Sequence, residues 1–461
     1  MDDKLKTAIR EYTKEIASYV KGFEYNDIPD EVVRQAKIVT LDTVGVLLAA
    51  SSPKYVASKA IVKLVRQLGG KEEATVVGSN FKTSCVNAAL ANGTMVNNIE
   101  LDDSHPKSGA HVAAVIVPSA LAMGEREKVD GKTFITSIVI GYDVDVRVVL
   151  GLNPSSLYKR GFHPSTIGGC FGSMATAGKI LDLDIDKIIK GFGLAGSEAS
   201  GLMAWETDPT QMPKSFQMGL AASNGVLAAL LAQNGFSGPP AIFEGKYGVL
   251  GAFSDEYHLE ELTDELGERF EITLTGLKQY ACCKFLHASI DSFLGIIREY
   301  DLSPEEISEI TIRIPTPGAP IVDNNELISH NAQYVMAVAA IDRNVTVDHI
   351  YEDRRTDPEV SNLSKRIKVV GDSELAKVFP GFFSEPAVVE VVTKEGRRLE
   401  KRTDYPKGDP GNPLTQEEAE KKFNSLATTV TSEEKAQKIT ELINDLENME
   451  NVAALCDLLR V

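Results

Sequence analysis

The first half of the chain is a succession of helical segments rich in Ala and Gly, joined by short polar loops. Their apolar residues recur at helical spacing, and strand-like alternation is nearly absent before about residue 250. Small side chains let helix backbones approach closely, because the distance between helix axes depends on the side chains at the contact. This feature predicts a compact α-helical domain with helices at 58–68, 85–96, 112–125, 131–150, 167–181, 185–197 and 220–233.

The pattern changes after about residue 255. Ile310, Ile312 and Ile314 alternate with polar residues, which is typical of a half-buried strand. Lys394-Glu395-Gly396 is a turn signal between two strand-like runs and predicts a hairpin. Further strands are expected at 366–370, 388–393 and 397–402, interleaved with helices at 285–299 and 331–342.

The chain is too long for one ordinary core, so two domains are expected. A Pro- and Gly-rich segment from Tyr405 to Pro413 marks a boundary, and Thr415 then begins a capped helix. We therefore predict a mainly α protein. Its large all-helical domain comprises residues 1–269 with 406–461, and its smaller α+β domain comprises residues 270–405.

Composition excludes several classes of partner. The net charge of −18 argues against nucleic acid, which needs a basic face. No apolar run reaches the length of a membrane span, so no membrane partner is expected. The N-terminal segment mixes both charge signs and has no apolar core, unlike a signal peptide. The cysteines are few, scattered and odd in number, which indicates free thiols in the cytoplasm: Cys85, Cys170, Cys282, Cys283 and Cys456.

The densest group of proton-transfer side chains lies between residues 97 and 111. Asp and His are the side chains most often used as general acid and base. Two adjacent carboxylates could instead be a helix cap with a solvated neighbour, since Asp favours such positions. The group comprises Asp102, Asp103, Ser104, His105 and His111.

Three further segments could carry chemistry. Lys159, Arg160 and His163 precede a helix that starts after Pro164, and cations beside a helix N-terminus favour an anion. Lys214 and Gln217 stand before the small-residue helix from Gly219. The third segment contributes Lys278, Tyr280, Cys283 and His287. Each also has a structural interpretation, as a surface cation or a buried core residue with a satisfied polar tip.

No metal or organic cofactor is predicted. His105 and His111 match no standard zinc spacing, and no third cysteine stands near Cys282 and Cys283 to hold an iron–sulfur cluster. No dinucleotide-binding or phosphate-binding glycine motif follows a strand. The side chains therefore indicate acid–base chemistry without a cofactor.

Six motifs in order resemble those of the MmgE/PrpD family. They are residues 98–104, Gly161-Phe-His-Pro164, Pro213-Lys214 with 219–225, residues 235–239, residues 278–291 and 411–415. The family includes 2-methylcitrate dehydratase, cis-aconitate decarboxylase and iminodisuccinate epimerase. The resemblance implies a helical domain built from both chain ends, a smaller α+β domain, a homodimer and an active site between the domains.

The resemblance also places residues by position. Asp102 or Asp103 with Ser104 stands where the family has Asp-Asp-Thr, and His111 matches a downstream His. This chain departs from the family at His111-Val112, where His-Pro is usual, and at Gln217, where His is usual. We predict catalytic roles for Asp102, Ser104, His111, His163, Lys214 and Tyr280. We predict substrate contacts for Asp103, His105, Lys159, Arg160, Gln217, Lys278, Cys283 and His287.

The chemistry that this resemblance implies is proton abstraction beside a carboxylate of a di- or tricarboxylic acid. His111 and His163 would form the acid–base pair, with Asp102 orienting a His or a substrate hydroxyl. Lys214 would hold a carboxylate and Tyr280 would donate from the facing domain. Dehydration of a citrate-type acid is the first reading, epimerisation the second and cis-aconitate-type decarboxylation the third. A homologue that binds a carboxylate without catalysis is the alternative outside enzymes.

Overall fold

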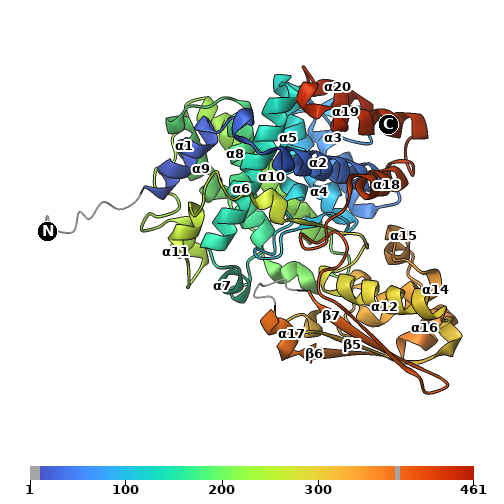
Figure 1. Ribbon diagram of the computed structural model, residues 1–461. Coiled ribbons are helices and arrows are strands. Elements are labelled where there is room, and N and C mark those ends of the chain that lie inside the picture. The colour runs from blue at the N-terminus through green and yellow to red at the C-terminus, as the bar shows by residue number, and fades with distance from the viewer. Residues whose placement is uncertain (1–10, 379–384) are drawn as a thin grey trace, which may run out of the picture.

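The computed structural model describes residues 11–378 and 385–461 and shows a mainly α protein with two domains (Figure 1). Residues 1–10 of the predicted helical domain lie outside the described residues. The buried apolar side chains form two separate clusters, one in each domain. The second cluster runs from Cys282 to Leu399, so the smaller domain has a core of its own.

The large domain contains every helix that the periodicity predicts. Most bounds agree within a few residues, but α10 begins at Met212 and not at residue 220. Met212 and Pro213 form its first turn, and Pro is well tolerated there because it needs no N–H partner. The helices are α1 (Tyr12–Gly22), α2 (Asp30–Ala50), α3 (Val56–Leu68), α4 (Cys85–Asn98), α5 (Ala113–Glu127), α6 (Gly131–Gly151), α7 (Pro154–Lys159), α8 (Pro164–Ile180), α9 (Ile185–Glu198), α10 (Met212–Gln233) and α11 (Val249–Phe253).

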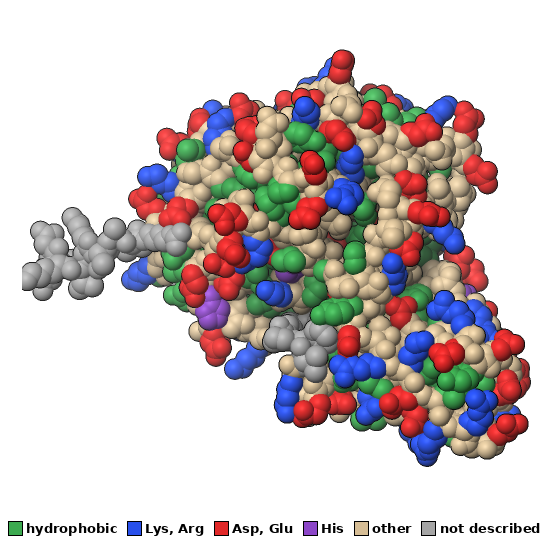
Figure 2. Space-filling model, viewed as in Figure 1, with side chains coloured by type: hydrophobic (Ala, Val, Ile, Leu, Met, Phe, Trp, Pro, Cys, Tyr) green, Lys and Arg blue, Asp and Glu red, His purple; other side chains and the backbone are tan. Residues whose placement is uncertain are grey.

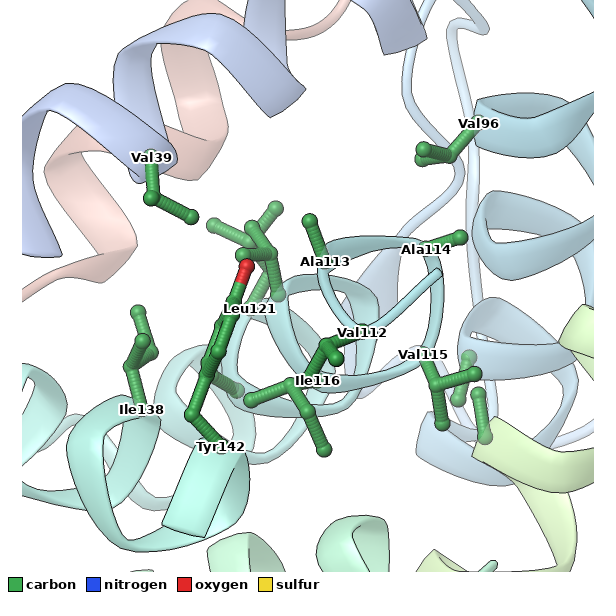
Figure 3. Packing of buried hydrophobic residues seen from close by; sticks show 14 of the residues in the cluster. Val39, Val96, Val112, Ala113, Ala114, Val115, Ile116, Leu121, Ile138 and Tyr142 are labelled. Carbon is green, nitrogen blue, oxygen red and sulfur yellow. The ribbon is translucent and has the colours of Figure 1, made fainter. Parts of the chain in front are cut away.

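Glycine lets the central helices touch backbone to backbone. A Cβ added to Gly219 of α10 would lie 2.2 Å from the carbonyl oxygen of Leu90 in α4, and one added to Gly93 would lie 2.9 Å from Gly219 Cα. No larger residue fits at this crossing without moving a helix. Around α5, Ile116 and Leu121 lie close to Tyr142 of α6 in a buried apolar layer (Figure 3). The predicted close packing of small residues is therefore present.

Helix α10 is the helix among the described residues that is long and apolar enough to cross a membrane. It packs against α4, α8 and α9 inside the large domain, and most of its length is buried there. Acidic and basic side chains are interspersed over the face of the molecule in Figure 2, without a broad basic field.

The C-terminal helices lie on the large domain (Figure 1). Helix α18 packs along α2, and a buried ion pair of 2.7 Å joins Lys422 of α18 to Asp42 of α2. Helix α20 packs against α5. The predicted boundaries at 269/270 and 405/406 stay predictions. The bounds of these helices are α18 (Gln416–Ala427), α19 (Glu433–Asn444) and α20 (Ala453–Leu458).

The smaller domain contains a four-stranded sheet of order β6-β5-β7-β8. β5 (Ile307–Pro315) pairs parallel with β6 (Ile367–Asp372) and antiparallel with β7 (Ala387–Thr393), which forms the predicted hairpin with β8 (Arg398–Thr403). The alternating isoleucines of β5 are buried as expected. The helices of this domain are α12 (His287–Tyr300), α13 (Ala319–Val322), α14 (Ala332–Asp342), α15 (Val347–Tyr351), α16 (Pro358–Ser364) and α17 (Ser373–Val378).

Short strands supplement the helices of the large domain. β1 (Ala74–Thr75) pairs with β2 (Lys82–Thr83), so this domain is not entirely helical. β3 (Asp103–Ser104) pairs antiparallel with β4 (Gly276–Leu277). The second pairing holds the predicted Asp-Asp-Ser segment beside the chain that enters the smaller domain.

Candidate active site

A cavity of about 500 Å³ is lined by residues from both domains. Six of the predicted site residues line it: Ser104, His111, His163, Lys214, Lys278 and Cys283. A larger cleft of about 1030 Å³ elsewhere contains Tyr280 but none of the lysines and histidines of the smaller cavity. The chemical groups that the sequence singled out therefore gather in the smaller cavity, which we take as the candidate active site.

Glu100 joins the two lysines of this cavity. Its Oε1 accepts a hydrogen bond of 2.5 Å from Lys214 Nζ on α10, and its Oε2 accepts one of 2.8 Å from Lys278 Nζ just after β4. Burial raises the pKa of Glu100, but attraction to Lys214 and Lys278 outweighs burial and holds the pKa well below its usual range. Glu100 is thus ionised, and one carboxylate serves two buried ammonium groups.

The backbone of Glu100 adopts a left-handed conformation with φ of 55°. Such a conformation is uncommon for a residue other than Gly, and it is often found at functional sites. It turns the chain between α4 and β3 and directs the carboxylate into the cavity. Glu100 was not among the predicted site residues, although it lies two residues before Asp102.

His111 is oriented by the Asp-Asp-Ser segment. Its Nδ1 lies 2.7 Å from the backbone oxygen of Asp103 and 3.3 Å from Oδ2 of Asp102. Oxygens without protons can only accept, so Nδ1 carries the proton and Nε2 of the neutral ring has the lone pair. Burial, with the charges of Lys214 and Lys278, lowers the pKa of His111 to about 4 despite the attraction of Asp102, so the ring is neutral near pH 7.

His163 has the same tautomer for a different reason. The Nε2 of Gln217 donates to the backbone oxygen of Leu202 at 3.0 Å, which turns Oε1 of Gln217 toward His163 Nδ1 at 3.1 Å. His163 therefore donates from Nδ1 and keeps a lone pair on Nε2. Burial, followed by the charge of Lys214, lowers its pKa to about 3. Gln217 thus positions His163 and is not among the residues that line the cavity.

Asp102 lies behind the cavity and supports it. Its Oδ2 accepts from Asn97 Nδ2 at 2.7 Å, and its Oδ1 lies 3.7 Å from Lys278 Nζ. The side chain is 1% exposed and is not a lining residue. Its place agrees with the predicted role of orienting a histidine.

Other predicted contacts lie away from the cavity. Asp103 points into the large domain, where it accepts from Tyr142 Oη at 2.8 Å and from the Ala113 amide at 2.9 Å. His105 is fully buried, with Nε2 3.2 Å from Glu271 Oε2. These contacts hold the loop together and do not place either side chain where it could touch a substrate.

The remaining predicted residues also lie outside the cavity. Tyr280 donates to Asp291 at 2.6 Å, because its ring turns toward α12 and the larger cleft. His287 is buried 5.4 Å from the Tyr280 ring, measured between centroids. Lys159 is exposed, and Arg160 forms an ion pair with Asp255 at the surface. The structure thus does not support Tyr280 as a donor, nor the other three as substrate contacts.

His330, Lys284 and Trp205 also line the cavity and were not among the predicted site residues. His330, at the end of a short helical turn before α14, is 7% exposed. Lys284 forms a buried ion pair of 3.1 Å with Glu385, and Trp205 lies 5.2 Å from Lys214 Nζ, measured to the ring centroid. Lys284 stands only six residues after Lys278, so its proximity was a usable signal. Within residues 11–378 and 385–461, no group of three His, Cys, Asp or Glu side chains is arranged to hold a metal ion.

Comparison with known proteins adds family information to this geometry. The cis-aconitate decarboxylase-like protein oryM of Aspergillus oryzae is 28% identical over 480 residues, covering 97% of both chains. The cis-aconitate decarboxylase of Aspergillus terreus is 25% identical over 474 residues, covering 97% of this chain and 95% of that protein. The 2-methylcitrate dehydratase of Cupriavidus necator is 24% identical over 407 residues, covering 81% of each chain.

Family-level matches cover both domains. The MmgE/PrpD N-terminal domain matches residues 14–262, which carry His111, His163 and Lys214. The MmgE/PrpD C-terminal domain matches residues 280–448. Because these two matches together account for most of its length, the chain belongs to the MmgE/PrpD family.

Proposed function

We propose that this protein decarboxylates an unsaturated tricarboxylic acid of the cis-aconitate type without a cofactor. The observation that carries the proposal is the arrangement around Glu100. Its single carboxylate is shared by Lys214 and Lys278, in the cavity that His111 and His163 also line. Such a cavity can hold a polyanion and move a proton.

The class of enzyme follows from the family. The relatives named above are decarboxylases and a dehydratase, and both kinds of enzyme are lyases, so the chain is a lyase. The decarboxylase relatives cover 97% of this chain and the dehydratase covers 81%. Because the decarboxylases cover more of this chain, we propose decarboxylation ahead of dehydration.

Lys214 and Lys278 bring two buried ammonium groups to the cavity, where Glu100 binds both and Asp102 lies 3.7 Å from Lys278 Nζ. Decarboxylation breaks one C–C bond, releases CO₂ and leaves an electron pair on carbon, which spreads onto a neighbouring carboxylate. Fixed cations stabilise this charge as it develops, because they need no reorganisation in the transition state. Lys214 and Lys278 are the groups placed to do so.

The carbon must also receive a proton, since a tricarboxylate that loses CO₂ becomes a dicarboxylate only when one proton is added. His111 and His163 each present an Nε2 lone pair that can take up this proton. A bound polyanion raises the pKa of a neighbouring histidine because it favours the charged ring. Substrate binding would therefore favour protonation of this histidine, which can then donate the proton to the carbon.

Dehydration of a 2-methylcitrate-type acid is the second candidate. The same Nε2 lone pairs could abstract a proton beside a carboxylate, and the family includes dehydratases. Epimerisation of a dicarboxylic acid, the second reading of the sequence, stays a prediction. We further propose a cytoplasmic homodimer that binds neither nucleic acid nor membrane, which agrees with the net charge of −18 and the free cysteines.

Product analysis tests the proposal. The full-length protein is incubated in H₂O and in D₂O with cis-aconitate, citrate and 2-methylcitrate, and products are followed by NMR and CO₂ release. We expect CO₂ and a dicarboxylate with one carbon-bound deuterium from cis-aconitate. Lys214→Met should lower kcat/KM by about 10²–10³-fold, whereas Lys63→Met, at an exposed position on α3, should leave it unchanged.

Two results would contradict the proposed decarboxylation. Loss of water from 2-methylcitrate without CO₂ release from cis-aconitate would favour the second candidate. Absence of turnover with every acid would remove the assignment to this substrate class. Light scattering after size exclusion tests the homodimer, and a monomer at micromolar concentration would reject it.

A further inference from the structure

The third histidine of the cavity, His330, differs from His111 and His163 in the partners of its Nδ1 atom. Gln211 Nε2 lies 3.0 Å from His330 Nδ1, and Ser329 Oγ also lies 3.0 Å from it. Gln211 Nε2 also donates to Ser329 Oγ at 2.9 Å, so this oxygen is already an acceptor and its own proton is available to the ring. Donors therefore surround Nδ1.

The tautomer of His330 follows from these contacts. An amide nitrogen has no lone pair to offer and can only donate, so Nδ1 of His330 must be the acceptor. In the neutral ring the proton then resides on Nε2. Burial lowers the pKa of His330 to about 3, so the neutral ring is the form present near pH 7.

The position of His330 makes this proton useful. The residue lines the cavity together with Lys214 and Lys278, and the centroid of the Trp205 ring lies 6.5 Å from that of His330 and 5.7 Å from that of His163. The cavity thus contains two imidazoles that present an Nε2 lone pair and one that presents an Nε2 proton. These are the groups needed to carry a proton to the carbon and to bind a developing oxyanion.

We propose that His330 is a further catalytic residue, whose Nε2–H donates a hydrogen bond to the substrate carboxylate that gains charge in the transition state. Gln211 is a positioning residue, because its amide sets the tautomer from the other domain. The inference rests on the proposed function for the identity of the substrate. The tautomer itself does not depend on it.

Two substitutions at position 330 distinguish the effect of the N–H donor from the effect of the side-chain bulk. Gln at position 330 retains an N–H near the place of imidazole Nε2, whereas Leu has the bulk without the donor. We expect His330→Gln to keep kcat/KM within about tenfold, and His330→Leu to lose about 10²–10³-fold, as is typical when one oxyanion donor is removed. His258→Gln and His258→Leu, at an exposed histidine, are the matched controls.

The tautomer is read directly by ¹⁵N NMR of histidine-labelled full-length protein, with the His330 signals identified by their loss in His330→Gln. We expect Nε2–H in the wild type and a change to Nδ1–H in Gln211→Glu, because a carboxylate at position 211 accepts where the amide donates. A wild-type ring with Nδ1–H, or one charged at pH 7, would overturn the proposal. So would wild-type activity of a folded His330→Leu protein.

The two proposals can fail separately. If no acid is turned over, the proposed function is rejected, and the role of His330 is then decided by the tautomer together with calorimetric binding of tricarballylate. Weaker binding by His330→Leu with an Nε2–H ring supports the donor. Equal binding by both proteins overturns it.

Discussion

Glu100 and Lys278 meet where the chain passes from the large domain to the smaller one, and Glu100 Oε2 accepts a hydrogen bond of 2.8 Å from Lys278 Nζ. Both side chains are almost completely buried. Since Glu100 also binds Lys214, its carboxylate is the shared counterion of two cations that cannot reach bulk water. A substrate carboxylate that enters the cavity can bind to the same ammonium groups.

Removal of the Glu100 charge should destabilise the fold. Glu100→Gln leaves Lys214 and Lys278 without their shared counterion, and an uncompensated buried charge typically costs about 3–5 kcal/mol. Urea unfolding followed by circular dichroism measures the loss. Glu434→Gln, at the exposed ion pair with Lys438, is the control and should leave the midpoint unchanged. An unchanged midpoint for Glu100→Gln would show that the pair contributes little.

His163 should make the protein less stable as the pH falls. Its pKa is about 3 in the folded protein and near 6.5 when unfolded, so below pH 6.5 the unfolded chain takes up a proton that the folded protein does not. From pH 6.5 to pH 5 this costs about 2 kcal/mol. Over this pH range, the free energy of unfolding of His163→Asn should therefore fall by that much less than that of the wild type. Equal losses in the two proteins, measured by urea unfolding at both pH values, would contradict the shift; His258→Asn is the matched control.

Asp103 should have the opposite dependence. Burial raises its pKa to about 8, so between pH 4 and pH 7 the unfolded chain releases a proton that the folded protein retains. Stability falls by about 1.4 kcal/mol per pH unit in this range. Asn at position 103 does not titrate and can still accept from Ala113 and donate to Tyr142. Asp103→Asn should therefore gain stability relative to the wild type as pH rises, and Asp186→Asn, at an exposed site, should not; parallel curves for Asp103→Asn and the wild type would refute the assignment.

The crossing of α4 and α10 should tolerate no side chain at Gly219. A methyl group there would lie 2.2 Å from Leu90 O, so Gly219→Ala must move α10 and with it Lys214. Overpacking of this kind typically costs about 1–3 kcal/mol. We expect a lower melting temperature and a lower kcat/KM. Gly22→Ala, where no atom lies within 4 Å of the added Cβ, is the control. A Gly219→Ala protein with wild-type melting would contradict this packing.

The spacing of apolar residues along the chain predicted most helices and strands, because each element must turn one apolar face toward the core. The isoleucines of β5 alternate because one face of the sheet is covered, and this is visible in sequence. The start of α10 was missed, since Lys214 and Gln217 were placed before the helix, whereas Pro213 already lies in its first turn. The left-handed Gln211 before it is fixed by its tertiary surroundings.

The site could be predicted only in part. His111, His163, Lys214 and Lys278 do meet, and for three of them the expectation came from family resemblance. Glu100 and His330 were missed because their role depends on partners from distant segments. Tyr280 was placed wrongly for a related reason: its hydroxyl binds Asp291, and local sequence does not determine which way a ring turns.

The short pairing of β3 with β4 determines which cavity residues would stay with the large domain if the two domains moved apart. Lys278 directly follows β4 and is fastened by it to the large lobe, whereas His330 lies beyond α12 and β5. With the domains apart, Lys214 and Lys278 would stay together and could bind a polyanion, while His330 would lie away from the cavity. Capture and chemistry would then be separated in time, and the arrival of the small lobe would begin the reaction.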